Sequence, residues 1–515
     1  MSINILWVDD EIEYLKPYVI FLNSRGYNVE VCNNGLDALK ILVDNKIDVV
    51  FLDEHMPGLS GIETLIKIKD KYPNIPVVMI TKSEEESIME DAIGSKIDDY
   101  LIKPVNPKQI ILSLKKIFEN KKLVVEKSII TFQQEYRNLV LQMSALNSFE
   151  DWVAYYKKLV YWELELDKYK EWNIIESLLN LKSEANNLFC KYVQNNYIGW
   201  LKAGNSSPLL SHKIFGNKIL PVLDDNKPVY LIVIDNLRYD QWKIIEPIVL
   251  ELFDMKEEYL YMSILPTTTK YARNAFFSGL MPIDIKDKYP QYWVVDEDES
   301  NANKYEEALM LEQLRSKNKN IKSSFYKILN SSYGKKVIDN LPNTMDNKLN
   351  VIIFNFVDML SHARTEIELI KELAENETAY RSVTLSWFDH SPLIEILRFL
   401  SDKKVNVIIT TDHGSIKVTV PSKISASKEV NSNLRYKEGK NIQYNIKDLW
   451  EVRNPSMIGL PQDVFASYFL IIKENKYFVM QHNYNQYVNY YKNSFQHGGI
   501  SMEEMIIPYV HLISK

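Results

Sequence analysis

The sequence predicts a multidomain α/β protein, and three observations support this. The chain has 515 residues, which exceeds one typical hydrophobic core and indicates two to four domains. Towards both ends, short apolar strand patterns alternate with helix patterns, as in doubly wound parallel sheets. Between them lie long helical patterns with almost no Gly or Pro. We therefore predict an α/β domain over 1–121, a helical bundle connector over 122–205 and a second α/β domain over 206–515.

The composition limits the classes of protein to consider. Apolar residues make up 46% of the chain and charged residues 25%, which are ordinary globular values. The net charge of −7 does not indicate a DNA-binding surface. Cys32 and Cys190 fall in different predicted domains, so they cannot build a zinc ribbon, and they fit a reducing cytosol. The sequence has neither an uncharged apolar run of about 18 residues nor a signal-peptide pattern, so we expect a cytoplasmic protein without membrane insertion.

The first domain alternates strand and helix patterns with short connections. Strand patterns occupy 3–10, 28–32, 47–53, 76–81 and 98–104. Helix patterns occupy 11–25, 35–45, 62–72, 84–93 and 107–119. Because each strand pattern is followed by a helix pattern, we expect the strands to be parallel.

Polar side chains end four of these strands: Asp9 and Asp10, Asp53, Thr81, and Lys103. Each residue alone could cap a helix or form a turn. Together they would meet at one edge of a parallel sheet, where clustered carboxylates suit a hard ion such as Mg²⁺. The central carboxylate, Asp53, could then attack a phosphoryl donor.

These motifs resemble the receiver domain of two-component response regulators: an acidic pair, Asp-x-x-Met-Pro-Gly, a Thr and a Lys-Pro on successive strand ends. The resemblance implies a flavodoxin-like fold, a sensor histidine kinase as partner, and homodimers on phosphorylation. It implies that Asp53 accepts the phosphoryl group and holds Mg²⁺ with Asp10 and the backbone carbonyl of His55, while Asp9 assists through water. The remaining motif positions would respond to phosphorylation: Thr81, Lys103 and Tyr100.

The connector has apolar and aromatic residues every three to four positions, over 129–146, 151–166 and 171–201. We interpret these segments as three or four amphipathic helices. The aromatic residues could instead form a stacking platform for nucleic acid, but a bundle core explains their spacing better. A bundle between two domains could carry a signal as a rigid-body shift.

The second α/β domain places metal-ligand residue types beside its strand ends and turns. Buried strand patterns precede Asp235, Asp358 and the Asp412–His413 pair. A Pro-Thr-Thr-Thr turn ends at Thr269. Carboxylates mixed with imidazoles suit zinc, and the set suffices for two adjacent ions. The candidate ligands in chain order are Asp235, Asp358, His362, Asp412, His413 and His497.

This order resembles the alkaline phosphatase superfamily, and the ending His-Gly-Gly-Ile-Ser-x-Glu-Glu-Met narrows it to PglZ-type domains. A receiver joined by helices to such a domain resembles PorX-type response regulators of type IX secretion. The resemblance implies a zinc-dependent phosphodiesterase with Thr269 as nucleophile, acting on cyclic and linear oligonucleotides. It divides the ligands between two zinc ions: Asp235, Thr269, Asp412 and His413 for one, and Asp358, His362 and His497 for the other.

The substrate-binding residues are less defined by the sequence. A phosphomonoester dianion would need an added cation, for which Lys270, Arg273 and Arg238 are candidates, although each could equally form a surface ion pair. The lysine-rich stretch 417–442, with Arg435 and Tyr436, could guide a phosphodiester backbone or be a solvated loop. We interpret 282–348 as an insertion forming a cap or lid.

A second function also fits the ligand set. The protein could be a signalling adaptor whose metal site is structural and whose output is contact with a sigma factor or a secretion component. An intact nucleophile at Thr269 favours the enzyme.

Overall fold

The structure, a computed structural model, describes residues 3–82, 97–169, 171–202, 208–294, 303–366, 375–426, 430–462 and 468–515, with backbone alone at 119–124, 172 and 362–366. It divides into two compact units, Met1–Phe132 and Gln133–Lys515. In the described residues, no helix has the length and apolar character needed to span a membrane.

The first unit is a parallel five-stranded sheet in the order β2-β1-β3-β4-β5. Its strands are β1 (Asn4–Val8), β2 (Asn28–Cys32), β3 (Val49–Asp53), β4 (Val77–Thr81) and β5 (Asp99–Ile102). Its helices are α1 (Lys16–Ser24), α2 (Gly35–Asp44), α3 (Gly61–Lys71) and α5 (Pro107–Met143), with a 3₁₀ turn at Ile12–Leu15. Separate apolar clusters cover the two sheet faces, so the predicted doubly wound sheet is confirmed. The helix predicted over 84–93 lies outside the described residues.

Helix α5 does not end where the sequence analysis placed its end. The pattern predicted a helix over 107–119, whereas the helix continues to Met143. No Gly or Pro occurs between Lys108 and Met143 to stop it. The last helix of the first unit therefore continues as the first helix of the predicted connector.

The rest of the connector consists of two helices, α6 (Phe149–Asp167) and α7 (Trp172–Lys202). Ser148 caps α6 with its hydroxyl and Asp151 returns a bond to the cap, a complete capping box. Trp152 packs against Phe189 of α7 with ring centroids 5.3 Å apart, and both side chains are buried. The core interpretation of the connector aromatics is thus supported at this pair.

The main sheet of the second unit has six strands in the order β7-β18-β10-β6-β9-β8. They are β7 (Phe253–Met262), β18 (Ile506–Ser514), β10 (Asn406–Thr410), β6 (Val229–Ile234), β9 (Leu349–Phe354) and β8 (Ser323–Ile328). The strands β10, β6, β9 and β8 are parallel, and β18 runs antiparallel between β10 and β7. The four parallel strands therefore end at one edge of the sheet.

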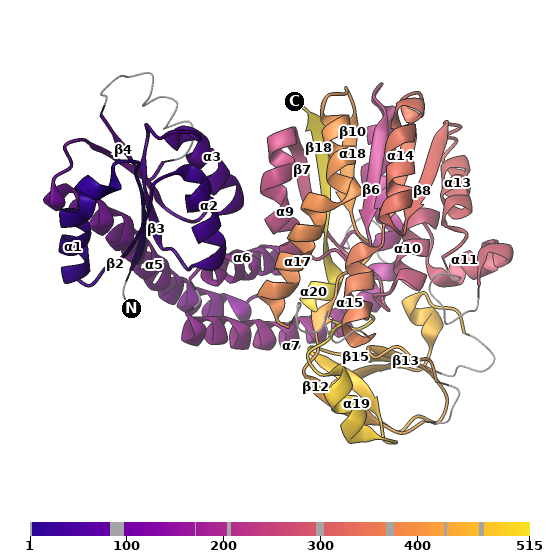
Figure 1. The fold of residues 1–515 in the computed structure, drawn as a ribbon. Coiled ribbons are helices and arrows are strands. Elements are labelled where there is room, and N and C mark those ends of the chain that lie inside the picture. The colour runs from indigo at the N-terminus through magenta and orange to yellow at the C-terminus, as the bar shows by residue number, and fades with distance from the viewer. Residues whose placement is uncertain are drawn as a thin grey trace. The chain divides into compact units, whose positions relative to one another are not determined.

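Helices cover both faces of this sheet (Figure 1). On one face α10 (Thr269–Ser278), α13 (Glu306–Ser316) and the segment 214–223 pack on alternate strand residues. α9 (Tyr239–Leu252) packs with α17 (Glu377–His390) and α18 (Pro392–Ser401) as well as with α6, and α18 also meets α14 (Ser331–Thr344). The strands β6 and β9 are buried along their whole length, as expected for a sheet covered on both sides.

Two sequence interpretations of this unit need correction. Residues 282–348 were expected to form a cap or lid, but β8 from this segment is the edge strand of the main sheet and α13 packs in its core. The stretch 417–442 was expected to be a solvated loop or an electrostatic guide. Its described part is not a plain loop, because it contributes β12 (Val420–Ile424) and β13 (Tyr436–Gly439) to two small sheets, whose other strands are β16 (Lys476–Met480), β15 (Tyr468–Ile472) and β14 (Leu449–Val452). The electrostatic guide stays a prediction. Figure 1 shows β12, β13 and β15 beyond one end of the main sheet.

Candidate functional site

Three candidate metal ligands converge at the carboxyl edge of the main sheet. Asp235 follows β6, and Asp412 and His413 follow the neighbouring β10. One ligand atom from each residue lies within 4.8 Å of the others, and all three side chains are buried. The predicted convergence of these strand ends is therefore observed, because adjacent parallel strands deliver their last residues to one place.

Thr269 lies beside this cluster as the first residue of α10. Its Oγ1 is 3.3 Å from Oδ1 of Asp235 and 3.1 Å from Nε2 of His413. The amino end of a helix presents unpaired N–H groups, which favour negative charge. Thr269 is thus the threonine of the Pro-Thr-Thr-Thr turn that faces the ligands, whereas the hydroxyl of Thr267 donates to the carbonyl of Gly499.

The two histidines are oriented as metal ligands usually are. Nδ1 of His413 lies 3.1 Å from the carbonyl of Gly414, and Nδ1 of His497 lies 3.2 Å from the carbonyl of Thr267. A carbonyl can only accept, so we assign the proton to Nδ1, which leaves the lone pair of each Nε2 for another partner.

Each of these Nε2 atoms faces carboxylate oxygens. Nε2 of His413 is 3.7 Å from Asp235 Oδ1 and from Asp412 Oδ2, and Nε2 of His497 is 3.3 Å from Asp358 Oδ1. Oδ2 of Asp412 is buried and, among the described residues, has no hydrogen-bond partner. Acceptors that face acceptors in a buried site need a cation between them. The donor set therefore fits divalent metal ions of the zinc type.

The second predicted ligand group is only partly described. His497 stacks on His413 with ring centroids 4.3 Å apart, which places it and Asp358 next to the first group. Asp358 and His362 both lie on α15 (Phe356–Glu366), four positions apart and so on one face. The side chain of His362 lies outside the described residues.

Asn236 contacts both ligand groups, and the sequence analysis did not identify it. Its Nδ2 donates to Asp358 Oδ1 at 3.3 Å, and its backbone N–H points at Asp412 Oδ1 at 3.5 Å. Its φ of 64° is left-handed, a conformation that Asn adopts more readily than most residues. A polar residue directly after a strand-end Asp was the available signal.

Arg273 supports a ligand rather than facing outward for substrate. Its Nη1 lies 2.5 Å from Oδ2 of Asp235, and its Nε lies 2.5 Å from Oε1 of Glu306. Burial alone would lower the pKa of Arg273, but the charges of Asp235 and Glu306 outweigh it and hold the pKa well above the ordinary value. The guanidinium thus stays charged and fixes the carboxylate of Asp235.

Two further cationic residues proposed for substrate binding form internal ion pairs instead. Arg238 is fully buried and pairs with Asp240 and Glu377. Arg435 is equally buried and pairs with Glu504 at 2.7 Å. Their predicted substrate roles are wrong for this structure, because neither side chain reaches solvent.

The first unit also gathers its predicted residues at a carboxyl edge. Nζ of Lys103 lies 2.9 Å from Oδ2 of Asp9 and 2.8 Å from Oδ1 of Asp53. Asp9, Asp10 and Asp53 offer oxygens within 4.8 Å of one another. The remaining predicted residues differ in exposure: Thr81 ends β4 and is buried, while Asp10, His55 and Tyr100 are exposed.

Burial and charge at this edge shift the pKa values of Asp53 and Lys103. Burial raises the pKa of Asp53, and Lys103 offsets part of that rise. Burial alone would lower the pKa of Lys103, but its hydrogen bonds to Asp53 and Asp9 outweigh it and the pKa is raised. The arrangement holds one cation, the Lys103 ammonium, between Asp9 and Asp53, and leaves Asp10 exposed.

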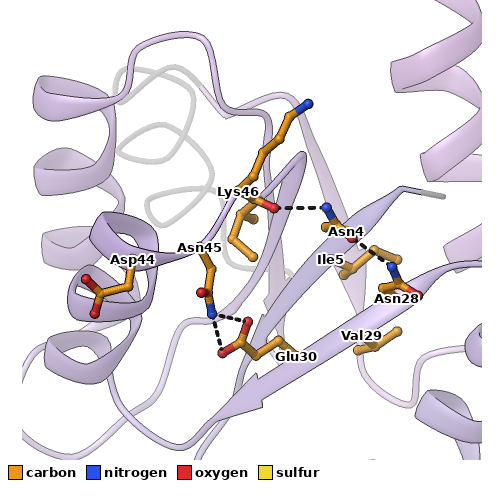
Figure 2. A pocket seen from close by; sticks show the side chains of 9 residues that line it. Asn4, Ile5, Asn28, Val29, Glu30, Asp44, Asn45 and Lys46 are labelled. Atoms are coloured by element: carbon orange, nitrogen blue, oxygen red, sulfur yellow. Dashed lines mark hydrogen bonds between the residues drawn. The ribbon is translucent and has the colours of Figure 1, made fainter. Parts of the chain in front are cut away.

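A shallow pocket in this unit lies at the other end of the strands. It has a volume of about 380 Å³ and is lined by Asn4, Asn28, Glu30 and Asn45, which Figure 2 shows joined by side-chain hydrogen bonds. Asn4 and Asn28 begin β1 and β2, so this pocket is at the amino ends of the strands. It is not part of the Asp53 site.

Comparison with known protein families covers nearly the whole chain. The response regulator receiver domain matches residues 5–115 and the PorX response regulator linker domain matches 122–201. The BREX system PglZ alkaline phosphatase-like domain matches residues 214–512, more than half of the chain. The chain belongs to the PglZ alkaline phosphatase-like family. This PglZ protein has the receiver, linker and effector order of PorX-type response regulators, so that prediction is confirmed.

Curated relatives match a smaller part of this PglZ protein. The transcriptional regulatory protein ZraR of Klebsiella oxytoca is 36% identical over 122 residues, which cover 24% of this chain and 28% of ZraR. A CpxR homolog of Haemophilus influenzae is 40% identical over 115 residues, which cover 22% of this chain and 49% of that protein. The chain thus spans between about a quarter and a half of the length of these relatives.

Solved structures give short matches of the same kind. A response regulator receiver domain from Clostridium thermocellum is 30% identical, covers 24% of this chain and 98% of its own, and has a TM-score of 0.23. The chemotaxis response regulator CheY4 of Vibrio cholerae is 25% identical, covers 23% and 99%, and has a TM-score of 0.22.

The family assignments set the coarse function. The protein is a two-component response regulator with a receiver domain. Its PglZ alkaline phosphatase-like domain points to hydrolase chemistry. Receivers and alkaline phosphatase-like domains generally use divalent metals, and both units contain acidic clusters suited to them.

Proposed function

We propose that the PglZ domain is a zinc-dependent phosphodiesterase with Thr269 as its nucleophile, under the control of Asp53. The position of the Thr269 hydroxyl supports this most directly. It lies at a helix amino terminus and 3.1–3.3 Å from two candidate ligands, where a phosphoryl group could meet both the nucleophile and the helix N–H groups.

The residues of the chain divide the chemistry between them. Zinc at the two ligand groups would supply Lewis-acid polarisation of phosphate oxygens and a lower pKa for the threonine hydroxyl. Thr269 Oγ1 gives up its proton to solvent water and bonds to phosphorus, while the ester alkoxide departs from the opposite side and takes a proton from water. A second water then attacks the phosphorus of the phosphothreonine, releases the remaining phosphate ester and returns a proton to the Thr269 oxygen. Arg273 keeps Asp235 oriented throughout.

The substrate we propose is a phosphodiester, in particular cyclic and linear oligonucleotides. A phosphomonoester dianion usually needs an added cation beside the metals, and Arg238 and Arg273 are committed to internal carboxylates. Lys270 follows Thr269 in α10 and is half-buried, and its ammonium lies 5.5 Å from the ring centre of Tyr271. A diester monoanion needs less compensation.

Hydrolysis of bis-p-nitrophenyl phosphate by the full-length chain with zinc tests the proposal. We expect activity that a chelator removes, that Thr269→Ala abolishes and that Thr269→Ser partly keeps. Hydrolysis of p-nitrophenyl phosphate should be slower. Undiminished activity in Thr269→Ala would rule out the threonine nucleophile.

The residues at the carboxyl edge of the receiver suggest how it would control the PglZ domain. We propose that Asp53 is phosphorylated with Mg²⁺ held by Asp10, Asp53 and the His55 carbonyl, and with Asp9 acting through water. Thr81, Lys103 and Tyr100 would respond, and two chains would then form a homodimer. Sedimentation with and without beryllofluoride should show a doubled mass, and an unchanged mass would contradict the dimer. We propose type IX secretion as the process regulated.

A signalling adaptor is the second candidate, and the burial of the metal site is compatible with it. Asp235, Asp412, His413 and His497 are each at most 2% exposed, which suits a structural ion as well as a catalytic one. In this case the output would be contact with a sigma factor or a secretion component. Zinc binding without hydrolysis of any diester would support the adaptor.

A further inference from the structure

One face of the linker helix α7 reaches the candidate metal site. Asn186, Cys190 and Tyr197 are spaced by four and seven residues, which places them on one side of the helix. All three side chains are buried, and each bonds to a backbone group of the PglZ domain. Their partners belong to the two segments that carry His497 and Thr269.

Asn186 fixes the start of the short helix α20 (Met502–Met505). Its Oδ1 accepts from the backbone N–H of Met502 at 2.8 Å, and its Nδ2 donates to Oε2 of Glu503 at 2.9 Å. Lys182, one turn earlier, lies 3.1 Å from the other oxygen of Glu503. Two consecutive turns of α7 therefore hold the residues that follow the His497 loop.

Cys190 contacts the same loop at Ile500, which is nearer in the chain to His497. Its sulfur lies 3.2 Å from the carbonyl oxygen of Ile500. Burial raises the pKa of the Cys190 thiol to about 12, so the thiol keeps its proton and donates it to the carbonyl. Ile500 is three residues from His497.

The His497 loop is joined directly to the threonine turn. The backbone N–H of Gly498 donates to Oγ1 of Thr267 at 2.9 Å, and Nδ1 of His497 pairs with the carbonyl of Thr267. Tyr197 anchors the same turn from the α7 side, because its hydroxyl accepts from the backbone N–H of Leu265 at 2.9 Å.

α20 also supports the turn after the other histidine. The N–H of Gly414 donates to the carbonyl of Glu504 at 3.1 Å, and a Cβ at Gly414 would lie 2.1 Å from the carbonyl oxygen of Glu503. This approach leaves room only for glycine. Through α20, α7 therefore meets the backbone on both sides of the ligand cluster.

We propose that α7 is a positioning element of the catalytic centre, with Asn186 setting the His497 metal-ligand loop and Tyr197 setting the nucleophile turn. This inference deepens the proposed function, and its kinetic test on Tyr197 rests on that function. A small shift of α7 would displace the nucleophile and a ligand together, and misplacement by about 1 Å can cost on the order of 100-fold in rate. The linker is then part of the machinery of the site rather than a spacer.

Zinc affinity tests the Asn186 arm without needing activity. In the full-length chain, Asn186→Ala should weaken the binding of one zinc ion by about 10- to 100-fold while leaving the other unchanged, measured by competition with a chromophoric chelator. Asn195→Ala, exposed on the same helix, is the matched control and should bind zinc as wild type does. If Asn186→Ala does not fold, Asn186→Ser takes its place.

Steady-state kinetics test the Tyr197 arm. Tyr197→Phe keeps the ring contacts and loses only the hydroxyl, so we expect kcat on bis-p-nitrophenyl phosphate to fall about tenfold with KM and zinc content unchanged. Tyr192→Phe on the same helix should leave kcat at the wild-type value. A purely structural role would lower the unfolding temperature of Tyr197→Phe without this change in kcat.

The outcomes separate the two proposals. Wild-type zinc affinity in Asn186→Ala, or wild-type kcat in Tyr197→Phe, would overturn the assignment of that residue. A wild-type chain that binds zinc but hydrolyses no diester would refute the proposed function, and the zinc affinity of Asn186→Ala would still decide the positioning of the His497 loop.

Discussion

The two acidic sites of this protein are built on the same principle and differ in how they are closed. Asp53 and Asp235 both end buried strands of sheets with parallel neighbours. At the receiver site Asp10 and His55 are exposed, and one lysine spans Asp9 and Asp53. At the PglZ site Asp235, Asp412, His413 and His497 are buried, and Arg273 and Glu306 are buried behind them.

This difference fits the role proposed for each site. An open acidic edge could exchange a Mg²⁺ ion and admit a phosphoryl donor from another protein. A buried mixed oxygen and nitrogen site can keep its ions, because ligand orientation is set by neighbours that cannot move. Changes at the PglZ site should therefore cost more than equivalent changes at the receiver site.

The largest effect is expected for Asp235→Asn. This change removes the charge of a candidate zinc ligand and leaves Arg273 with Glu306 at 2.5 Å and the more distant Asp412 at 3.9 Å. We expect diesterase activity to fall by at least about 10³-fold, with one fewer zinc per chain by elemental analysis. Full zinc content with normal activity would remove Asp235 from the ligand set.

A smaller effect is expected for Arg273→Met. Breaking a buried ion pair from one side usually costs about 3–5 kcal/mol, because the acids are left uncompensated. We expect the free energy of unfolding in urea to fall by that amount in a chelator. Zinc should recover part of the loss, since it would neutralise Asp235. An equal loss with and without zinc would separate Arg273 from the metal site.

The linker network offers an intermediate test that depends on pH. Glu163 of α6 pairs with Arg381 of the PglZ domain at 2.6 Å and with Lys182 at 2.8 Å. Burial alone would raise the pKa of Glu163, but Lys182 and Arg381 outweigh it and lower the pKa to about 2. A lowered acid pKa contributes stability above the unfolded value, and this stability is lost as the pH falls towards the folded value.

Glu163→Gln should therefore destabilise the second unit at neutral pH by about 3 kcal/mol and by less near pH 3, where the wild type also begins to lose the charge. Urea unfolding at both pH values checks this. Exposed Glu150→Gln on the same helix is the control. An equal difference at both pH values would contradict the charge argument.

The smallest effect is expected for Asp53→Asn in the receiver. Burial raises the pKa of Asp53, so the ionised carboxylate disfavours folding and the protonated form does not. The contribution is favourable at low pH and is lost as the pH rises through the folded pKa. In a chelator, Asp53→Asn should raise the urea midpoint slightly at neutral pH and hardly at all at pH 3, and Mg²⁺ should cancel the difference. A lowered midpoint would show that the Lys103 pair outweighs burial.

Sequence reasoning went furthest where a local rule has a global consequence. Residues that follow parallel strands must meet at one sheet edge, so Asp235, Asp412 and His413 could be grouped without coordinates. The same rule grouped Asp9, Asp53 and Lys103. It failed where a partner lies far away in the chain, as for Arg238 with Glu377 and Arg435 with Glu504.

The sequence by itself determined the fold class, the order of receiver, linker and PglZ domain, and the residue types at both acidic sites, because strand periodicity and strand-end chemistry are local properties. Only the tertiary structure decided which cationic side chains form ion pairs with internal carboxylates. It also revealed Asn236 between the ligand groups, and it placed Asn186 against Met502, more than 300 residues away. Such contacts depend on how elements pack, and packing is decided by the whole chain at once.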